Sequence, residues 1–356
     1  MKNVMVAWVT GNEKNFEQHV PLLFVGQRNQ ALGFSNTIHV LFMQGFERLS
    51  QSYKDSLQSC GYVLHDVSEL YAHYAQTYAV LHSFGDYETK CFLRWLVIDQ
   101  FFAGEQIIHY DGDVVFNEDP AIITSKVQGL TFVLQGCPAF TVISDRIWLE
   151  RYKRELDLFT RDIHGYSARA WQMRKGWEVT FTTRWSGSRF REIISSDQDF
   201  ISHLMHTGSI KQDSVEQIKL ALNDYVVFQN PLLIHLYNEQ IPYRYQRQAG
   251  IDYFLWNRAD GPNQSYGKKV LLWHMQSCFT FYASKHILRK KYIGLLRFTR
   301  QTYNPSGKTY EDWLNKHVAR FTQHTLRSNV YDYFFKTHDF SSLMNGKTWW
   351  KEGVFL

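Results

Sequence analysis

Short apolar runs alternate along this chain with longer stretches in which apolar residues recur at helical spacing. The runs are bounded by turn residues such as Gly, Asn, Asp and Pro, as is typical of buried strands. Strands alternating with helices predict an α/β domain. Residues 238–267 are punctuated by Pro and Gly, and we expect a loop there. The predicted strands are 4–9, 37–43, 62–67, 107–110, 114–116, 130–134, 140–143, 225–228 and 270–274, and the longest predicted helices are 16–32, 70–84, 87–102 and 147–159.

A change of composition after residue 284 predicts a division of the chain. We expect an α/β domain at residues 1–284 and a helical, basic and aromatic C-terminal extension at residues 285–356. In the extension, Lys and Arg interleave with Ile, Leu and Phe, as in amphipathic helices that lie on anionic membranes. The alternative is a helix that packs its apolar face on the domain and leaves its cations in water.

Charge and cysteine content narrow the expected partners and compartment. The formal net charge is +5, which fits an anionic substrate or a membrane surface and does not indicate nucleic acid. The 4 cysteines are scattered without disulfide or metal-site spacing, which favours a reducing, cytoplasmic location. The first residues do not resemble a signal peptide, and no apolar run reaches about 18 residues, so we expect no membrane span.

The strongest chemical signal is Asp111-Gly112-Asp113, which lies between two apolar runs. In an extended chain, residues i and i+2 point to the same side, so Asp111 and Asp113 can direct their carboxylates at one point. Gly112 leaves the backbone between them open to a ligand. Carboxylate oxygens suit Mn²⁺ or Mg²⁺, which commonly hold phosphates. The alternative is a plain turn, because Asp and Gly also close strands without a metal.

This segment resembles the Asp-x-Asp motif of the metal-dependent nucleotide-sugar glycosyltransferases with the A-type (GT-A) fold. The resemblance implies a single Rossmann-like GT-A domain with a mixed central sheet. It also implies that Asp111 and Asp113 hold the metal and that Asp111 lies at the donor. In that family an Arg-bearing helix leads into this strand and contacts the donor, and Arg94 occupies the matching position. Lys90 lies four residues earlier on the same helix face, so the pair can reach a diphosphate. A solvated basic helix edge is the alternative.

A second motif, Asp197-Gln198-Asp199, follows Ser196 at the predicted start of a helix. Ser196 can cap this helix and the acidic residues favour its N-terminus, and that structural role could be complete in itself. The segment also resembles the Asp-Gln-Asp motif of the family 8 retaining glycosyltransferases. The resemblance implies that Asp197 contacts the hydroxyls of the donor sugar and that Gln198 lies near the reacting anomeric carbon. We expect Asp199 to support the helix start.

Further positions match the same family less closely, and each has a structural alternative. His274 follows a late apolar run, where the family places a metal-binding His, so we expect it to be the third ligand. The usual Lys is displaced, and Lys285 is the nearest candidate for a phosphate contact. Thr10 and Asn12 follow the first strand, where ligands of open α/β sheets bind, so they are candidates for base or ribose contacts. Gly136, in a small-residue turn, resembles the segment beside the donor sugar.

The segment 167–191 is rich in Trp and cations. Trp faces can lie under sugar rings, and Arg can bind an anion, so this segment is a candidate wall for the acceptor. The residues we expect to bind the acceptor are Trp177, Arg184 and Trp185. The alternative is an irregular surface loop anchored by buried Trp side chains.

Together these motifs predict a metal-dependent glycosyltransferase. It would move a sugar from a nucleotide diphospho-sugar, by resemblance a UDP-sugar, to a glycan or lipid-linked glycan. The metal would neutralise the charge that grows on the leaving diphosphate. We expect retention; in an inverting enzyme Asp197 or Asp199 would be the candidate base. A sugar-1-phosphate nucleotidyltransferase and a non-catalytic carbohydrate-binding protein are the alternatives, although the first normally carries a Gly-rich phosphate loop and the second needs no convergent carboxylates.

Overall fold

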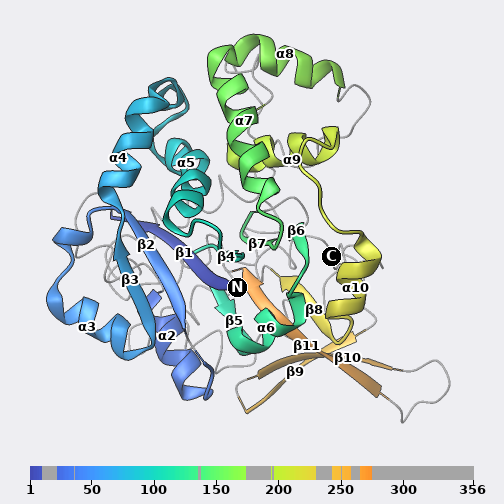
Figure 1. The fold of residues 1–356 in the computed structure, drawn as a ribbon. Helices are drawn as coiled ribbons and strands as arrows, with labels where there is room; N and C mark the ends of the chain where they lie inside the picture. The colour runs from blue at the N-terminus through green and yellow to red at the C-terminus, as the bar shows by residue number, and fades with distance from the viewer. Residues whose placement is uncertain are drawn as a thin grey trace, which may run out of the picture.

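The structure, a computed structural model, describes residues 1–9, 22–35, 37–134, 138–173, 194, 196–229, 243–249, 251–257 and 265–274. These residues form an α/β protein with helices around a mixed six-stranded sheet, as predicted, and with a second, five-stranded sheet that was not predicted (Figure 1). The first sheet has the strand order β3-β2-β1-β4-β7-β6. The second has the order β5-β11-β10-β9, and β8 also pairs with β11.

The first sheet reverses its strand order next to β1. β1 pairs in parallel with both β2 and β4, β2 pairs in parallel with β3, and β7 is antiparallel to both of its neighbours, β4 and β6. The chain runs outward through β2 and β3 on one side of β1 and returns as β4 on the other. In open α/β sheets, ligands bind beyond the carboxyl ends of the strands at such a reversal. The strands are β1 (Lys2–Trp8), β2 (Ile38–Gln44), β3 (Tyr62–Asp66), β4 (Ile107–Tyr110), β6 (Thr131–Val133) and β7 (Phe140–Ile143).

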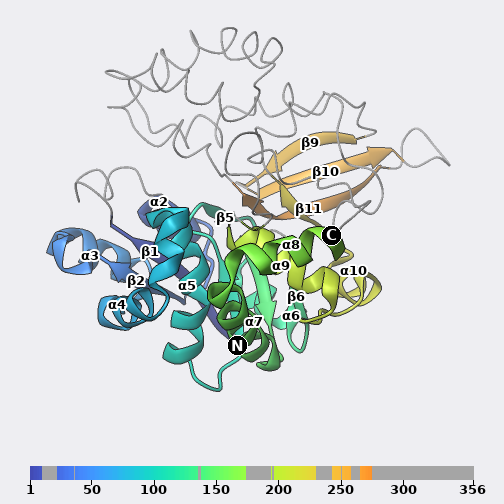
Figure 2. The ribbon, with the colours of Figure 1, turned by 90° about the horizontal axis from the view of Figure 1, so that it is seen from above.

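The second sheet corrects the loop predicted at residues 238–267. In its described part, β9 and β10 form an antiparallel hairpin and β11 begins at Ser265. Aromatic residues favour strands here, and Gly267, one of the residues that suggested a loop, lies within β11 opposite Leu255. Figures 1 and 2 both place this hairpin at the opposite end of the molecule from α3. The strands are β5 (Val114–Phe116), β8 (Tyr225–Gln229), β9 (Tyr243–Gln248), β10 (Ile251–Asn257) and β11 (Ser265–His274).

Several helices agree with the prediction, and four were missed: α3, α6, α8 and α10. The predicted helix at 70–84 is split, because α4 ends at Thr77 and a 3₁₀ segment, Ala79–Phe84, follows. Of the missed helices, α3, α6 and α10 each have an N-cap side chain that accepts a backbone hydrogen bond. The described helices are α2 (Leu22–Ala31), α3 (Gln51–Ser59), α4 (Ser68–Thr77), α5 (Asp86–Phe101), α6 (Pro120–Val127), α7 (Ile147–Arg161), α8 (Ile163–Met173), α9 (Asp197–Thr207) and α10 (Val215–Leu222).

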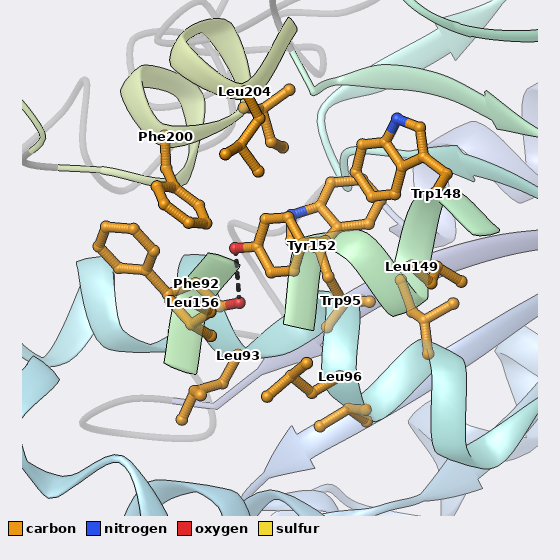
Figure 3. Packing of buried hydrophobic residues seen from close by; sticks show 14 of the residues in the cluster. Phe92, Leu93, Trp95, Leu96, Trp148, Leu149, Tyr152, Leu156, Phe200 and Leu204 are labelled. Atoms are coloured by element: carbon orange, nitrogen blue, oxygen red, sulfur yellow. Dashed lines mark hydrogen bonds between the residues drawn. The ribbon is translucent and has the colours of Figure 1, made fainter. Parts of the chain in front are cut away.

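Helix α5 is the centre of the core. One side of it packs in the same apolar cluster as Val4 and Val6 of β1, and the other meets α7 and α9. Figure 3 shows Trp95 of α5 beside Trp148 and Tyr152 of α7, and Tyr152 donates a hydrogen bond to the Phe92 carbonyl at 3.0 Å. Full burial of one such aromatic side chain contributes about 1.5–3 kcal/mol. This packing fixes where α9 begins relative to α5.

Two predictions about the C-terminal part concern residues outside the described ranges. The boundary at residue 284 and the basic extension at 285–356 both lie beyond His274, the last described residue. Among the described residues, no helix combines the length and the apolar character that a membrane span requires.

Candidate metal and donor site

Asp111, Gly112 and Asp113 form the link between the two sheets. β4 ends at Tyr110 in the first sheet, and β5 begins at Val114 in the second. The link is a turn and not the extended strand that was predicted, because the Val114 N–H donates to the Asp111 carbonyl at 3.1 Å. The carboxylates therefore converge through a turn at the carboxyl end of β4, beside the reversal of strand order.

His274 reaches this turn through strand pairing. β11 runs antiparallel to β5, with His274 opposite Val114, the residue after Asp113. The His274 Nε2 atom lies 3.6 Å from the Asp113 Oδ1 atom. One ligand atom each from Asp111, Asp113 and His274 lies within 4.8 Å of the other two. The structure thus brings together the three residues that the sequence predicted as metal ligands.

Polar contacts beyond the turn hold β11 in this register. The buried Asn117 side chain donates to the Val270 carbonyl at 2.7 Å. Lys269 of β11 forms an ion pair with the buried Glu118 at 2.9 Å. A slip by one residue would turn His274 to the other face of the sheet and would break both contacts.

The three residues fit a divalent metal ion. The Asp113 Oδ1 atom is buried and has no hydrogen-bond partner among the described residues. A buried carboxylate oxygen without a partner is costly, and a cation would supply the missing interaction. Two carboxylates and one imidazole suit Mn²⁺, whereas Mg²⁺ more often takes oxygen ligands alone.

The two carboxylates of the turn differ in their electrostatic environment. Burial raises the pKa of Asp113 to about 6; Asp111 adds to the rise and His274 opposes it. Burial acts in the same direction on Asp111, but the Arg94 guanidinium in direct contact opposes it, and the pKa of Asp111 lies below its usual range. Asp111 therefore already has a cationic partner, and Asp113 is the group that a metal would relieve most.

Arg94 joins the two predicted motifs. Its Nη1 donates to Asp111 Oδ1 at 2.6 Å, and its Nε and Nη2 donate to Asp197 Oδ2 at 3.0 and 2.7 Å. The residue is only 5% exposed. Burial disfavours its charge, but Asp197 and Asp111 outweigh this effect and raise the pKa of Arg94. Arg94 therefore lies in the predicted site, where it binds Asp111 and Asp197. Its predicted contact with the donor stays a prediction.

Asp197 and Gln198 are the first two residues of helix α9, which begins beside Arg94. Ser196 caps the helix, as predicted, by accepting a hydrogen bond from the Asp199 N–H. Asp197 Oδ2 also accepts a hydrogen bond from the Trp95 indole N–H at 3.1 Å. Burial raises the pKa of Asp197, and Arg94 and Trp95 oppose this rise only in part. The role of Trp95 was not predicted, since an apolar helix position gave no sign of a polar contact.

Lys90 occupies a different place from Arg94. It is fully buried, forms an ion pair with Asp86 one helical turn earlier, and lies 5.7 Å from the centre of the Tyr71 ring. Its ammonium group is therefore directed towards α4, although the two cations are four residues apart on one helix. The predicted contact of Lys90 with a diphosphate stays a prediction.

His109 lies behind the carboxylates and was not predicted. It is buried, and its Nε2 lies 3.9 Å from Asp111 Oδ1. Burial, with Arg94 nearby, lowers the pKa of His109 to about 3, so the ring is neutral. The Nδ1–H donates to the Pro138 carbonyl at 3.0 Å. Its position two residues before Asp111 was the available signal, since alternate residues of a strand share a side.

The remaining predicted contacts lie outside the described residues. They concern the nucleotide base or ribose, the donor sugar, a phosphate and the acceptor, and all of them stay predictions. These residues are Thr10, Asn12, Gly136, Trp177, Arg184, Trp185 and Lys285.

No protein-family model matches this chain, and no curated protein matches it. The function is therefore inferred from the motifs and from the geometry of the site.

Proposed function

We propose that this protein is a metal-dependent GT-A glycosyltransferase that transfers a sugar from a nucleotide diphospho-sugar, a UDP-sugar by resemblance, to a glycan or lipid-linked acceptor. One observation carries the proposal. The buried Asp113 Oδ1 has no hydrogen-bond partner among the described residues and lies 3.6 Å from His274 Nε2. Asp111 completes the cluster beside the strand-order reversal, where α/β sheets bind ligands.

The charges of the site suit the departure of a diphosphate. A divalent ion bound by Asp111, Asp113 and His274 would supply a Lewis acid for the charge that grows on the leaving oxygen. All hydrogen bonds that Asp197 accepts from described residues go to Oδ2. Its Oδ1 atom is left to accept a hydrogen bond from a sugar hydroxyl, and Arg94 and Trp95 hold the carboxylate in that orientation.

The surroundings of Asp197 favour a retaining reaction. A base for an inverting reaction must take a proton from the acceptor, whereas Asp197 is buried and held by Arg94 and Trp95. The Asp199 carboxylate is engaged at the helix start, where its Oδ2 accepts a hydrogen bond from Ser196 Oγ at 3.2 Å. Gln198 lies between them on the first turn of α9 and carries no charge, which suits a residue beside an oxocarbenium-like state.

The test is nucleotide release from a panel of UDP-, GDP- and CMP-sugars, with Mn²⁺ or with chelator. We expect slow hydrolysis of one donor by the wild-type protein with Mn²⁺, and loss of that hydrolysis with chelator and in Asp113→Asn. Asp55→Asn, an exposed Asp on α3, is the matched control and should behave as wild type. The proposal is wrong if no donor is hydrolysed and Mn²⁺ does not change the affinity for any nucleotide.

A further inference from the structure

We propose that Arg94 is a positioning residue whose fixed charge couples metal binding at Asp111 to binding of the donor diphosphate. This inference rests on the proposed function, because it concerns the same metal and the same donor. It goes further in assigning to Arg94 an effect on the order and cooperativity of binding. Arg94 would weaken binding of the metal alone and favour binding of the metal together with the diphosphate.

Arg94 is shared between the carboxylates of Asp111 and Asp197. The guanidinium donates through Nη1 to Asp111 and through Nε and Nη2 to Asp197, two residues from different motifs. Asp111 is therefore both the partner of Arg94 and a candidate metal ligand. A divalent ion on Asp111 would compete with Arg94 for the same negative charge.

Burial holds the Arg94 guanidinium in place beside Asp111 and Asp197. Its side chain is 6% exposed, and it belongs to the helix at the centre of the core. The Arg94 Cζ atom lies 5.2 Å from the centre of the Trp95 ring, and the Trp95 indole N–H holds Asp197 as well. Figure 3 shows Trp95 of α5 against Trp148 and Tyr152 of α7. The positive charge is thus part of the scaffold.

Like charges would repel each other in this partly buried site. The Arg94 side chain is 6% and the Asp111 side chain 28% exposed, so water would screen only part of the repulsion between a divalent ion on Asp111 and the guanidinium. The metal alone would therefore bind less tightly than the three ligands allow. A diphosphate brings negative charge that both cations attract, so each of the two ligands raises the affinity for the other.

The experiment measures Mn²⁺ binding, and UDP binding with and without Mn²⁺, by calorimetry. We expect Arg94→Gln to bind Mn²⁺ alone about tenfold more tightly than wild type and to lose most of the mutual enhancement between Mn²⁺ and UDP. Arg94→Lys keeps the charge and should keep the weak Mn²⁺ binding and the enhancement. It should lower kcat for donor hydrolysis, because Lys cannot make the paired contact with Asp197. Arg154→Gln, at an Arg whose side chain is 64% exposed, is the control.

A second variant changes the surroundings of the Arg94 guanidinium and keeps its charge. Asp197→Asn leaves Arg94 in place and takes away one of its two carboxylates, so Mn²⁺ alone should bind more weakly than to wild type. Equal or weaker Mn²⁺ binding by a folded Arg94→Gln protein, or unchanged Mn²⁺ binding by Asp197→Asn, would overturn the inference while the proposed function stands. Absence of Mn²⁺ binding to wild type would overturn both.

Discussion

Replacement of Asp113 by Asn should stabilise the protein without metal and remove its stabilisation by metal. The Asp113 Oδ1 atom is buried without a hydrogen-bond partner among the described residues, and the pKa of this carboxyl is raised from 3.8 to about 6. A carboxyl with a raised pKa binds its proton more tightly in the folded state than in the unfolded state. Its ionised form therefore costs stability increasingly as the pH rises above 3.8, the full cost is reached above about pH 6, and Asn removes that cost.

The size of the effect follows from the pKa. A rise from 3.8 to about 6 corresponds to about 3 kcal/mol at pH 8, since each tenfold change in the dissociation constant is worth about 1.4 kcal/mol. The Asp113 side chain is 28% exposed, so water screens part of this cost. We expect Asp113→Asn to raise the free energy of unfolding by about 1–3 kcal/mol at pH 8 in chelator. The gain should be about half as large at pH 5 and vanish near pH 3.

The measurement is urea denaturation followed by tryptophan fluorescence, in chelator at pH 8 and pH 5 and in Mn²⁺ at pH 8. Mn²⁺ at about 1,000 times its Kd should stabilise wild type by about 4 kcal/mol, because it binds only the folded state. The variant lacks one ligand and should gain much less, so the order of stability reverses between chelator and Mn²⁺. Asp55→Asn is the control and should change stability by less than about 0.5 kcal/mol in every condition.

Two results would refute this reasoning. A less stable Asp113→Asn protein in chelator at pH 8 would mean that the carboxylate stabilises the turn, and that its burial is not a cost held for a ligand. An equal gain from Mn²⁺ in wild type and in the variant would mean that Asp113 is not a metal ligand.

Three further substitutions test neighbouring parts of the site. Gly112→Ala should leave the Tm within about 2 °C, because an added Cβ meets nothing within 4 Å, yet should weaken UDP binding in calorimetry if the diphosphate lies over this turn. Trp95→Phe keeps the ring packing but loses the hydrogen bond to Asp197, so urea denaturation should show a loss of about 1.5–3 kcal/mol; no loss would remove Trp95 from the site. Ser196→Ala removes the cap of α9 and should cost about 1 kcal/mol in the same assay, with slower donor hydrolysis; unchanged values would argue against a fixed helix start.

Local patterns predicted much of the fold because burial and capping leave marks in neighbouring residues. The apolar runs at β4 and β5, and the Ser196 cap of α9, were predicted close to their observed bounds. The missed helices α3, α6 and α10 also begin at cap residues, but they are only 9, 8 and 8 residues long, and so short a stretch gives a weak periodic signal. The hairpin β9–β10 was missed because the Gly and Pro residues of 238–267 were weighted above the aromatic residues between them.

The sequence by itself determined the chemistry available at the site: two carboxylates beside a glycine, a capped helix with an Asp at its first position, and a histidine at the end of an apolar run. Tertiary structure decided which of these meet. His274 reaches Asp113 only because β11 pairs with β5, and an apolar run shows that a strand is buried without showing its neighbour. Arg94 and Lys90 lie four residues apart on α5, a spacing that places them on one helix face. Arg94 nevertheless contacts Asp111 and Asp197, whereas Lys90 lies against Tyr71 of α4, because the partner of a cation depends on the element packed against it.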